Sequence, residues 1–539
     1  MRGNPSIITK GLAWLTRLAQ LVQRRKKAKQ LKKNNYVNST FTSAGTQVAV
    51  GAEPIEAYEK YAEDTLLVGI AHLVFRLRGL VLLPVLTKTL GAETYGIWTQ
   101  ILVTIGLLAL LASLQLGQAM TRFLTAKEDK NQISQGVFSI LVVMSLTAAM
   151  SSLLMFALTG TLAGTVFGGG NYEPFIKMAV PLLFVTIVLE HFIRQYFRAF
   201  RRMRTYSVFV ILQTIGEITL VSYSIFAGFG LSGALYSLLA IRLLMLIIGC
   251  LLIIAQVKIA GPSFSLIKPY LAFSLPLIPF MFCAWIVDAS DRYIVGYFIN
   301  INAVGLYSAA YNLGNLVQFF VAPIWIVLLP ALTILYENNK THELKTHLKY
   351  SLKFFVAFAI PAFFGLSILA KTLLRMLTTA EFIEVHPITP IVALATVLFG
   401  SSTIMGHILM LLKKTRTLAL VYGGSALINI VLNIALVPVI GILGAAIATL
   451  ATSTIHIIVM SKIAFKEIPF DIDLKFIIKS IISSAIMGLI VFILNPGNVQ
   501  TVVISVIVGV VIYFGMLLLL RGVTKEEYAF LKGIIKKRV

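Results

Sequence analysis

Charge is scarce in this 539-residue chain. Charged residues make up only 13% of it, hydrophobic residues make up 58%, and the mean hydropathy is +0.89. A soluble domain is about a quarter charged, so a long chain with so few charges needs lipid around most of its surface. Soluble enzymes, nucleic-acid-binding domains and disordered proteins are therefore excluded. Lys and Arg number 46 against 22 Asp and Glu, and anionic membrane lipids are the expected partners of that positive excess.

Cysteine and recognisable catalytic motifs are also scarce. Cys250 and Cys283 lie in apolar runs, so we expect two small core residues and neither a disulfide nor a metal site. The sequence has no Cys/His metal-ligand spacing, no Gly-rich phosphate loop and no nucleophile elbow. We therefore expect a polytopic membrane protein that is not an enzyme, with no catalytic residue, no metal, no cofactor and no nucleic-acid partner.

Long apolar runs dominate what is present. About 20 apolar residues are enough to span a bilayer as a helix, and continuous runs favour helices over the alternating strands of a barrel. The sequence predicts an all-α membrane protein with fourteen transmembrane helices. The predicted spans are 66–86, 97–117, 133–155, 176–196, 207–228, 231–255, 272–296, 303–335, 351–370, 387–412, 417–437, 441–462, 474–494 and 500–520.

The distribution of positive charge predicts the orientation of these spans. Lys and Arg accumulate in cytoplasmic loops. With the N-terminus inside, the outer loops and their edges carry only Lys88, Lys177, Lys371 and Arg375. We therefore expect both termini to be cytoplasmic and the protein to be a multi-pass component of the cell (cytoplasmic or inner) membrane.

Three sequence matches at nearly constant spacing indicate an internal repeat. The matching segments are Gly96–Trp98 with Gly305–Tyr307, Arg201–Thr205 with Lys413–Thr417, and Gly230–Ala234 with Gly441–Ala445. Each copy holds six predicted spans. Because six is even, both copies enter the membrane from the same side. The sequence therefore predicts two parallel lobes with a site between them, an arrangement that suits alternating access.

The predicted domains follow from the repeat. They are a basic cytoplasmic tail (1–62), an N-lobe (63–262), a C-lobe (263–466), two further helices (467–522) and a second basic cytoplasmic tail (523–539). In the first tail, apolar residues recur at helical spacing between Ile8 and Val22, and a basic run follows. This pattern predicts an interfacial amphipathic helix on an anionic leaflet. A dispensable basic tail is the alternative.

Charged residues inside predicted spans are the candidate site residues. Each costs about 2.5–3.5 kcal/mol at the bilayer centre unless it faces a partner or a cavity. Arg76 and Arg78 lie in the first span, roughly 200° apart around the helix, so only one of them can face the cavity between the lobes. We favour Arg78 for the cavity and expect Arg76 to pack against its own lobe or to snorkel.

The seventh span, which is the repeat's copy of the first, carries Asp288, Asp291 and Arg292. Asp288 corresponds in the repeat to the position beside Arg78, so a carboxylate and a cation are expected to face each other across the cavity. The spacing also allows a salt bridge within the helix between Asp288 and Arg292, which would leave Asp291 unpaired. Arg292 is a candidate for substrate binding, and the two aspartates are candidates for lining the cavity or coupling an ion.

Two further charges, Glu217 and Arg242, lie at equal distances from the turn between the fifth and sixth spans. A structural ion pair is the favoured interpretation, and a proton-linked Glu217 is the alternative. His407 and His456 are expected to be packing residues. Buried arginines outnumber buried carboxylates, which suits an anionic phosphate or pyrophosphate group in the cavity.

Two segments carry a family resemblance. Leu90–Trp98, and Asp291–Tyr297 continuing into Val304–Ser308, resemble signatures of polysaccharide transporters. These are the Wzx-type lipid-linked oligosaccharide flippases of the multidrug/oligosaccharidyl-lipid/polysaccharide (MOP) superfamily. The resemblance covers about residues 63–522. The basic N-terminal tail departs from the family pattern.

The resemblance implies a V-shaped pair of six-helix lobes. It also implies a flippase that moves a polyprenyl-(pyro)phosphate-linked oligosaccharide from the cytoplasmic to the outer leaflet for cell-surface polysaccharide or glycan biosynthesis. Coupling to an ion gradient and polysaccharide-assembly proteins as partners are further implications. In the related lipid II flippases, arginines of the first span help to hold the pyrophosphate and two extra helices form a groove for the lipid tail. The resemblance gives these roles to Arg76 or Arg78 and to 467–522.

Two other functions remain as alternatives. A MATE-like ion-coupled antiporter of drugs or small solutes is the nearest, although such transporters typically have twelve helices. A membrane-embedded polysaccharide polymerase or glycosyltransferase would need catalytic residues on a sizeable loop. The longest predicted outer loop, about 156–175, has a single charge, Glu173. The flippase is therefore the predicted function.

Overall fold

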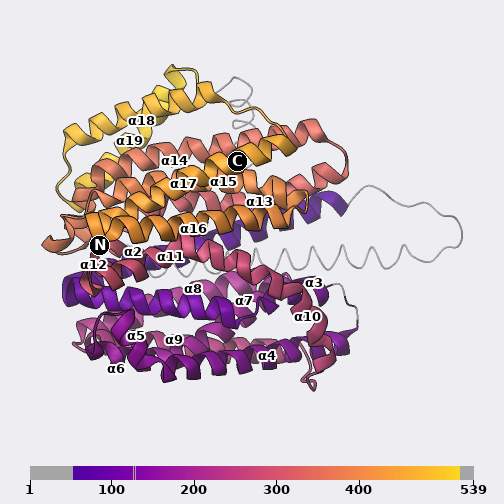
Figure 1. The fold of residues 1–539 in the computed structure, drawn as a ribbon. Coiled ribbons are helices and arrows are strands. Elements are labelled where there is room, and N and C mark those ends of the chain that lie inside the picture. The colour runs from indigo at the N-terminus through magenta and orange to yellow at the C-terminus, as the bar shows by residue number, and fades with distance from the viewer. Residues whose placement is uncertain (1–52, 126, 128, 523–539) are drawn as a thin grey trace, which may run out of the picture. The chain divides into compact units, whose positions relative to one another are not determined.

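Every regular element in the part of the chain that the structure describes is a helix (Figure 1). The structure is a computed structural model, and it describes residues 53–125, 127 and 129–522. The predicted amphipathic helix between Ile8 and Val22 lies outside the described residues, and so does the tail 523–539. The elements below belong to the compact unit that begins at Ala62, although the first helix starts nine residues earlier.

The described residues of the first half of the chain form ten helical elements. They are α2 (Glu53–Ala112), α3 (Leu116–Phe123), α4 (Lys130–Ala157), α5 (Thr159–Thr165), η1 (Gly170–Tyr172), α6 (Glu173–Thr186), η2 (Ile187–Ile193), α7 (Arg194–Ala199), α8 (Met203–Phe226) and α9 (Gly230–Ile254). The element η2 is a π-helical turn. It joins α6 to α7, so that the three elements form one crossing helix.

The second half continues from η3 to the last described helix. Its elements are η3 (Phe264–Leu266), α10 (Ile267–Ser274), η4 (Leu275–Leu277), α11 (Ile278–Phe298), α12 (Ile301–Gly314), η5 (Asn315–Phe320), α13 (Val321–Glu337), α14 (Thr341–Leu377), η6 (Ala380–Phe382), α15 (Ile388–Leu411), α16 (Thr415–Ile440), α17 (Ile442–Glu467), α18 (Leu474–Leu494) and α19 (Val499–Leu519).

Twelve helices in the described part of the chain are long and apolar enough to cross a membrane, and the sequence predicts fourteen spans. The difference has two local causes. The predicted spans 66–86 and 97–117 belong to one element, Leu67–Ala112, which is broken at Gly91 (φ 78°, ψ 178°). Glycine adopts this positive φ without steric cost. The predicted span 303–335 is divided among α12, η5 and α13, and none of these pieces has the length of a span.

The internal repeat is visible in the backbone. Arg201 and Lys413, which precede α8 and α16, both have left-handed backbones (φ 53° and 57°). Gly230, which begins α9, and Gly441, which precedes α17, also share a positive φ (59° and 64°). The hairpins α8–α9 and α16–α17 are each packed along their length. Since left-handed backbone is costly outside glycine, its recurrence at matched positions agrees with the predicted repeat.

The two copies meet at Gly96 of α2 and Gly305 of α12. A Cβ atom placed on Gly96 would lie 2.0 Å from the carbonyl oxygen of Ile301, and one placed on Gly305 would lie 2.0 Å from that of Ala92. The contact is symmetric, because the same sequence offset relates both pairs of residues. Only glycine permits two helix backbones to approach this closely.

Polar contacts join the lobes close to this crossing. The Glu381 carboxylate, in η6, accepts a hydrogen bond of 3.1 Å from the backbone N–H of Ala92, just beyond the break in α2. The Asn312 amide of α12 donates to the Tyr95 hydroxyl at 3.0 Å. The lobes are therefore joined close to the break in α2.

The last two helices stand outside the repeat. The helix α18 packs against α14 of the C-lobe and against α19 (Figure 1). The Lys353 ammonium of α14 lies 3.1 Å from the Asp473 carboxylate, which also caps the start of α18 by accepting from the Phe476 N–H at 2.9 Å. The additional pair of helices is thus attached to the C-lobe by apolar packing and by an ion pair.

Candidate functional site

A cavity of about 350 Å³ lies between the N-lobe and the C-lobe. The helices α2, α11 and α12 and the short element η5 line it. The helix α11 contributes Trp285, Asp288 and Arg292, whose spacing of three and four residues places them on one face. The volume is at the lower end of the range for ligand sites in proteins, so the cavity can hold a small molecule or one part of a larger one.

Arg78 and Asp288 reach this cavity from opposite lobes. Asp288 is exposed, and its carboxylate accepts a hydrogen bond of 3.3 Å from the Tyr311 hydroxyl. Arg76 has a different contact: its Nη1 donates to the side-chain oxygen of Gln318 in η5 at 2.5 Å. Because η5 belongs to the C-lobe, the expectation that Arg76 packs against its own lobe or snorkels is wrong. Arg76 bridges the two lobes.

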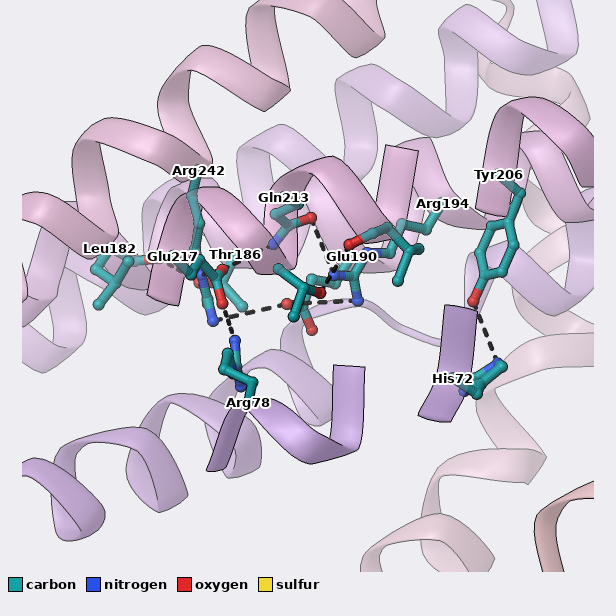
Figure 2. A network of polar contacts seen from close by, with 12 residues as sticks. His72, Arg78, Leu182, Thr186, Glu190, Arg194, Tyr206, Gln213, Glu217 and Arg242 are labelled. Carbon is teal, nitrogen blue, oxygen red and sulfur yellow. Dashed lines mark hydrogen bonds and ion pairs between the residues drawn. The ribbon is translucent and has the colours of Figure 1, made fainter. Parts of the chain in front are cut away.

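A buried network of polar side chains in the N-lobe binds the Arg78 guanidinium. Figure 2 shows Arg78 reaching from α2 toward this network. The Arg78 guanidinium forms an ion pair with Glu217, and Arg242 Nε lies 2.9 Å from the same carboxylate. The Gln213 amide donates to Glu217 at 2.9 Å, and Arg242 donates to the Thr186 hydroxyl at 2.6 Å. Glu217 and Arg242 are thus paired, and their pair belongs to a larger cluster.

Two members of this network, Glu190 and Arg194, were missed in the sequence. Glu190 Oε1 lies 3.6 Å from Arg194 Nη1 and 3.8 Å from Arg242 Nη2. Arg194 also donates to the Gln213 side-chain oxygen at 2.9 Å. Glu190 belongs to the π-helical turn η2, and such turns are rare and frequent at functional sites. The signal that was present in the sequence was a carboxylate inside the predicted span 176–196.

The network carries an excess of positive charge next to the cavity. Arg78, Arg194 and Arg242 face Glu190 and Glu217 within it. The Arg78 side chain is 18% exposed, whereas that of Glu217 is 0% exposed. Removing one partner from a buried ion pair leaves an uncompensated charge and is strongly unfavourable. The buried members therefore fix the position of the one arginine among them that lines the cavity.

The C-lobe pairs its charges differently from the sequence expectation. Arg292 Nη1 lies 3.1 Å from the Asp291 carboxylate and donates to the backbone carbonyl of Asp288 at 3.0 Å. The Tyr307 hydroxyl donates to the other oxygen of Asp291. The salt bridge between Asp288 and Arg292, one of the two alternatives that the spacing allows, is therefore wrong, and Asp291 is the paired aspartate. Asp291 faces α12, whose tyrosine satisfies it, and the Asp288 carboxylate is left to face the cavity.

The two intramembrane histidines are held by contacts within the C-lobe. His407 Nδ1 donates to the Thr403 carbonyl at 2.8 Å, and His456 Nδ1 lies 2.7 Å from the Ser425 hydroxyl. Neither histidine is among the residues that line the cavity. Among the described residues, no group of three His, Cys, Asp or Glu side chains is arranged to bind a metal ion.

Comparison with known proteins gives matches along most of the chain. The model of the family described as "Polysaccharide biosynthesis protein" matches residues 61–335. "Probable low-salt glycan biosynthesis flippase Agl15" of Haloferax volcanii is 21% identical over 454 residues, covering 83% of this chain and 93% of that protein. "Probable flippase AglR" of the same organism is 25% identical over 246 residues, covering 44% of this chain and 51% of that protein.

Solved structures share the fold at low sequence identity. The lipid II flippase MurJ in an inward closed conformation has a TM-score of 0.70 and 16% identity, covering 84% of this chain and 98% of that one. An inward-facing MATE multidrug resistance transporter of the MOP superfamily has a TM-score of 0.59 and 14% identity, covering 74% of this chain and 98% of that one. At these identities the likeness is one of fold.

Proposed function

We propose that this chain, which belongs to the polysaccharide biosynthesis protein family, is a flippase that moves a polyprenyl-(pyro)phosphate-linked oligosaccharide from the cytoplasmic to the outer leaflet. The observation that carries the proposal is the cavity between the two repeat copies, lined by an arginine that a buried network holds in place. The names of the two Haloferax volcanii relatives, each described as a probable flippase, support a flippase activity.

The proposed topology has fourteen crossings with both termini in the cytoplasm. The helix α2 crosses twice, because its break at Gly91 separates two apolar stretches, and α12, η5 and α13 together cross once. These two additions bring the twelve long apolar helices to fourteen. The placement of Lys and Arg in the loops supports this orientation. The membrane is proposed to be the cell (cytoplasmic or inner) membrane.

In the proposed mechanism, Arg78 binds the phosphate part of the substrate. A guanidinium makes charge-assisted, frequently bidentate hydrogen bonds to phosphate oxygens. Glu217 keeps Arg242 and Gln213 as partners, so Arg78 can turn toward a phosphate without leaving a buried carboxylate unpaired. Asp288 and Arg292 line the opposite wall of the site, and the buried Asp291 is paired with Arg292.

The proposed transport cycle alternates the side on which the lobes separate. In this topology the Gly96–Gly305 crossing and the Glu381 contact to Ala92 lie toward the outer leaflet, so the structure is closed on that side. Release of the headgroup outside requires these contacts to part. The cavity between the lobes would then change the side from which it is reached.

A MATE-like antiporter of small solutes is the second candidate, since the MATE fold is similar. The helices α18 and α19 favour the flippase. They lie beyond the twelve helices of the repeat and pack on the C-lobe, and the MurJ fold covers a larger share of this chain than the MATE fold does. A groove for the lipid tail is the role proposed for them.

A leaflet-exposure assay in proteoliposomes tests the proposal. Vesicles would contain a fluorescent polyprenyl-diphosphate oligosaccharide together with the wild type, Arg78→Ala, the control Arg202→Ala or no protein. The exposure of the fluorescent lipid would be compared among these four preparations. Arg202 is an exposed arginine outside the cavity. We expect protein-dependent exposure that falls by about tenfold or more in Arg78→Ala, the effect of losing one charge-assisted contact, and that persists in Arg202→Ala.

Two outcomes would contradict the proposal. Unchanged transport in Arg78→Ala would remove Arg78 from the binding site. Absence of exposure from folded wild-type protein with lipid-linked sugars, together with exchange of a cationic dye against protons or sodium, would favour the antiporter.

A further inference from the structure

We infer that the C-lobe wall of the cavity is a recognition subsite for an uncharged sugar ring, formed by Trp285, Asp288, Asn312 and Asn315. The inference rests on the proposed function. It assigns the two walls of the cavity to different parts of the substrate: Arg78 on the N-lobe wall to the phosphate, and the C-lobe wall to the sugar attached to it.

The cations at the cavity are already compensated by buried carboxylates. Arg78 is paired with Glu217, and Arg292 is paired with Asp291, whose side chain is 2% exposed. Arg292 itself is almost completely buried and lies over the Tyr311 ring at 4.3 Å. The positive charge of Arg292 is thus compensated within the C-lobe and is not presented to a ligand in the cavity.

The polar groups that this wall presents to a ligand are a carboxylate and two carboxamides. Asp288 is exposed and has no ion pair among the described residues. Asn312 is also exposed and uses one of its two amide N–H groups on Tyr95, and its carbonyl oxygen is available to a donor. Asn315 lines the same wall. Carboxylate and carbonyl oxygens accept hydrogen bonds, so they suit sugar hydroxyl groups, which donate, and do not suit phosphate oxygens, which only accept.

Trp285 supplies an aromatic surface beside these acceptors. It lies three residues before Asp288 on α11, so the two side chains are neighbours on one helix face. The Trp285 ring is half-buried and is supported by the parallel ring of Phe282 (6.4 Å between centroids, 4° between planes) and the edge contact of Tyr293 at 5.7 Å. A rigid aromatic face of this kind packs against the C–H face of a sugar ring at a low cost in side-chain entropy.

The Asp288 carboxylate also makes the subsite selective. An acidic sugar would bring a second carboxylate against Asp288, and juxtaposed like charges discriminate against a ligand. An uncharged ring meets no such repulsion. A cavity of about 350 Å³ has room for only part of an oligosaccharide, so the selection would act on the sugar next to the phosphate.

Binding of three short-chain probes to the full-length protein in nanodiscs tests this assignment. The probes are citronellyl diphosphate, the same diphosphate carrying glucose, and the same diphosphate carrying glucuronic acid. We expect the wild type to bind the glucose probe about tenfold more tightly than each of the other two, the scale of one or two hydrogen bonds. Asp288→Asn should abolish the discrimination between glucose and glucuronic acid.

Two variants and a control complete the design. Asn312→Ala and Trp285→Leu should weaken binding of the glucose probe severalfold and leave the sugar-free diphosphate unchanged. Asp471→Asn, which removes an exposed carboxylate outside the cavity, should resemble the wild type with all three probes. Each variant is first checked to be monodisperse and folded.

The outcomes separate this inference from the proposed function. Equal binding of the three probes by a wild type that transports a lipid-linked oligosaccharide would overturn the sugar subsite and keep the flippase. Equal weakening of all three probes by Asp288→Asn would overturn it as well. Failure to bind any probe, together with failure to expose lipid-linked sugar in vesicles, would overturn both.

Discussion

The two lobes share a backbone plan, yet they treat buried charge in different ways. At the offsets of 212 and 211 residues that relate the copies, Glu217 corresponds to Asn429 and Arg242 corresponds to Ser453. Where the N-lobe has an ion pair of 2.9 Å, the C-lobe has neutral groups. Its Asn429 accepts a hydrogen bond of 3.2 Å from the Ser290 hydroxyl.

The comparison separates what the fold needs from what the site needs. The left-handed backbones at Arg201 and Lys413, and the glycines Gly96 and Gly305, recur in both copies because each copy must turn and cross in the same way. The charged cluster is present in only one copy, so the fold does not require it. The N-lobe uses it to present an arginine to the cavity, and the C-lobe presents hydrogen-bond acceptors instead.

The largest effect is expected from removing the N-lobe carboxylate. Glu217→Ala leaves Arg78 and Arg242 without their shared partner, and breaking a buried pair in this way costs about 3–5 kcal/mol. Thermal unfolding in detergent and the yield of folded protein should both fall sharply. Asn429→Ala at the corresponding C-lobe position removes neutral hydrogen bonds, so it should cost only about 1 kcal/mol.

A double variant sharpens this test. If the N-lobe cluster is a mutually compensated unit, Glu217→Gln combined with Arg242→Gln should destabilise the protein by less than the sum of the two single changes. Strictly additive losses, or equal losses at Glu217 and Asn429, would show that the two lobes do not differ in the way described.

A smaller effect is expected at the crossing of Gly96 and Gly305, and it concerns access to the cavity from the outer side. Gly96→Ala would place a methyl group 2.0 Å from the Ile301 carbonyl oxygen, so α2 and α12 would have to move apart. We expect a cysteine introduced at Thr99, which lines the cavity, to react severalfold faster with an impermeant maleimide added from the outer side. The native cysteines would first be replaced by alanine.

The symmetry of the crossing provides its own control. Gly305→Ala should have the same effect as Gly96→Ala, because each glycine meets the other helix's backbone in the same way. Gly69→Ala, where an added Cβ atom meets nothing within 4 Å, should leave the reaction unchanged. If all three variants react at the wild-type rate, the crossing does not hold the outer side closed.

Most of the fold could be predicted from the sequence because the membrane imposes a simple rule. A helix in lipid must satisfy its own backbone hydrogen bonds and be apolar along its length, so apolar runs mark helices. The rule fails where a helix breaks. The interruption at Gly91 falls in the polar segment 87–96 between two predicted spans, and one helical element continues through that segment. The division of 301–337 into three pieces leaves the segment apolar throughout, so hydropathy alone does not reveal it. The family resemblance is confirmed by the match to residues 61–335.

The candidate site was partly predictable for a related reason. Arg78, Glu217 and Arg242 stood out because charge in the middle of a span is costly and needs a partner. Glu190 was not predicted as a site residue because it lies near the end of its span, where charged side chains can reach water. The choice between Asp288 and Asp291 depended on which of them is buried against Tyr307 of α12, and helical periodicity alone contains no information about the neighbouring helix.

The smallest effect is expected at the ion pair between Lys353 of the C-lobe and Asp473. This pair is partly exposed, whereas the charged cluster of the N-lobe is buried. Burial acts to raise the pKa of Asp473, but the Phe476 N–H and the Lys353 ammonium outweigh it and hold that pKa below its usual range. A depressed pKa means that the carboxylate stabilises the fold above the ordinary Asp pKa of about 3.9, and that this contribution is lost as the pH falls through the folded-state pKa.

The Asp473 side chain is 27% exposed, so solvent screening limits its contribution to about 1 kcal/mol or less. Between pH 7 and pH 3, the wild type should therefore lose slightly more thermal stability than Asp473→Asn, which has no such charge to lose. Asp471→Asn, an exposed neighbour, should follow the wild type. Equal acid sensitivity of the wild type and Asp473→Asn would show that the ion pair to α14 does not stabilise the attachment of α18. The packing between the two helices would then hold α18 and α19 to the C-lobe by itself.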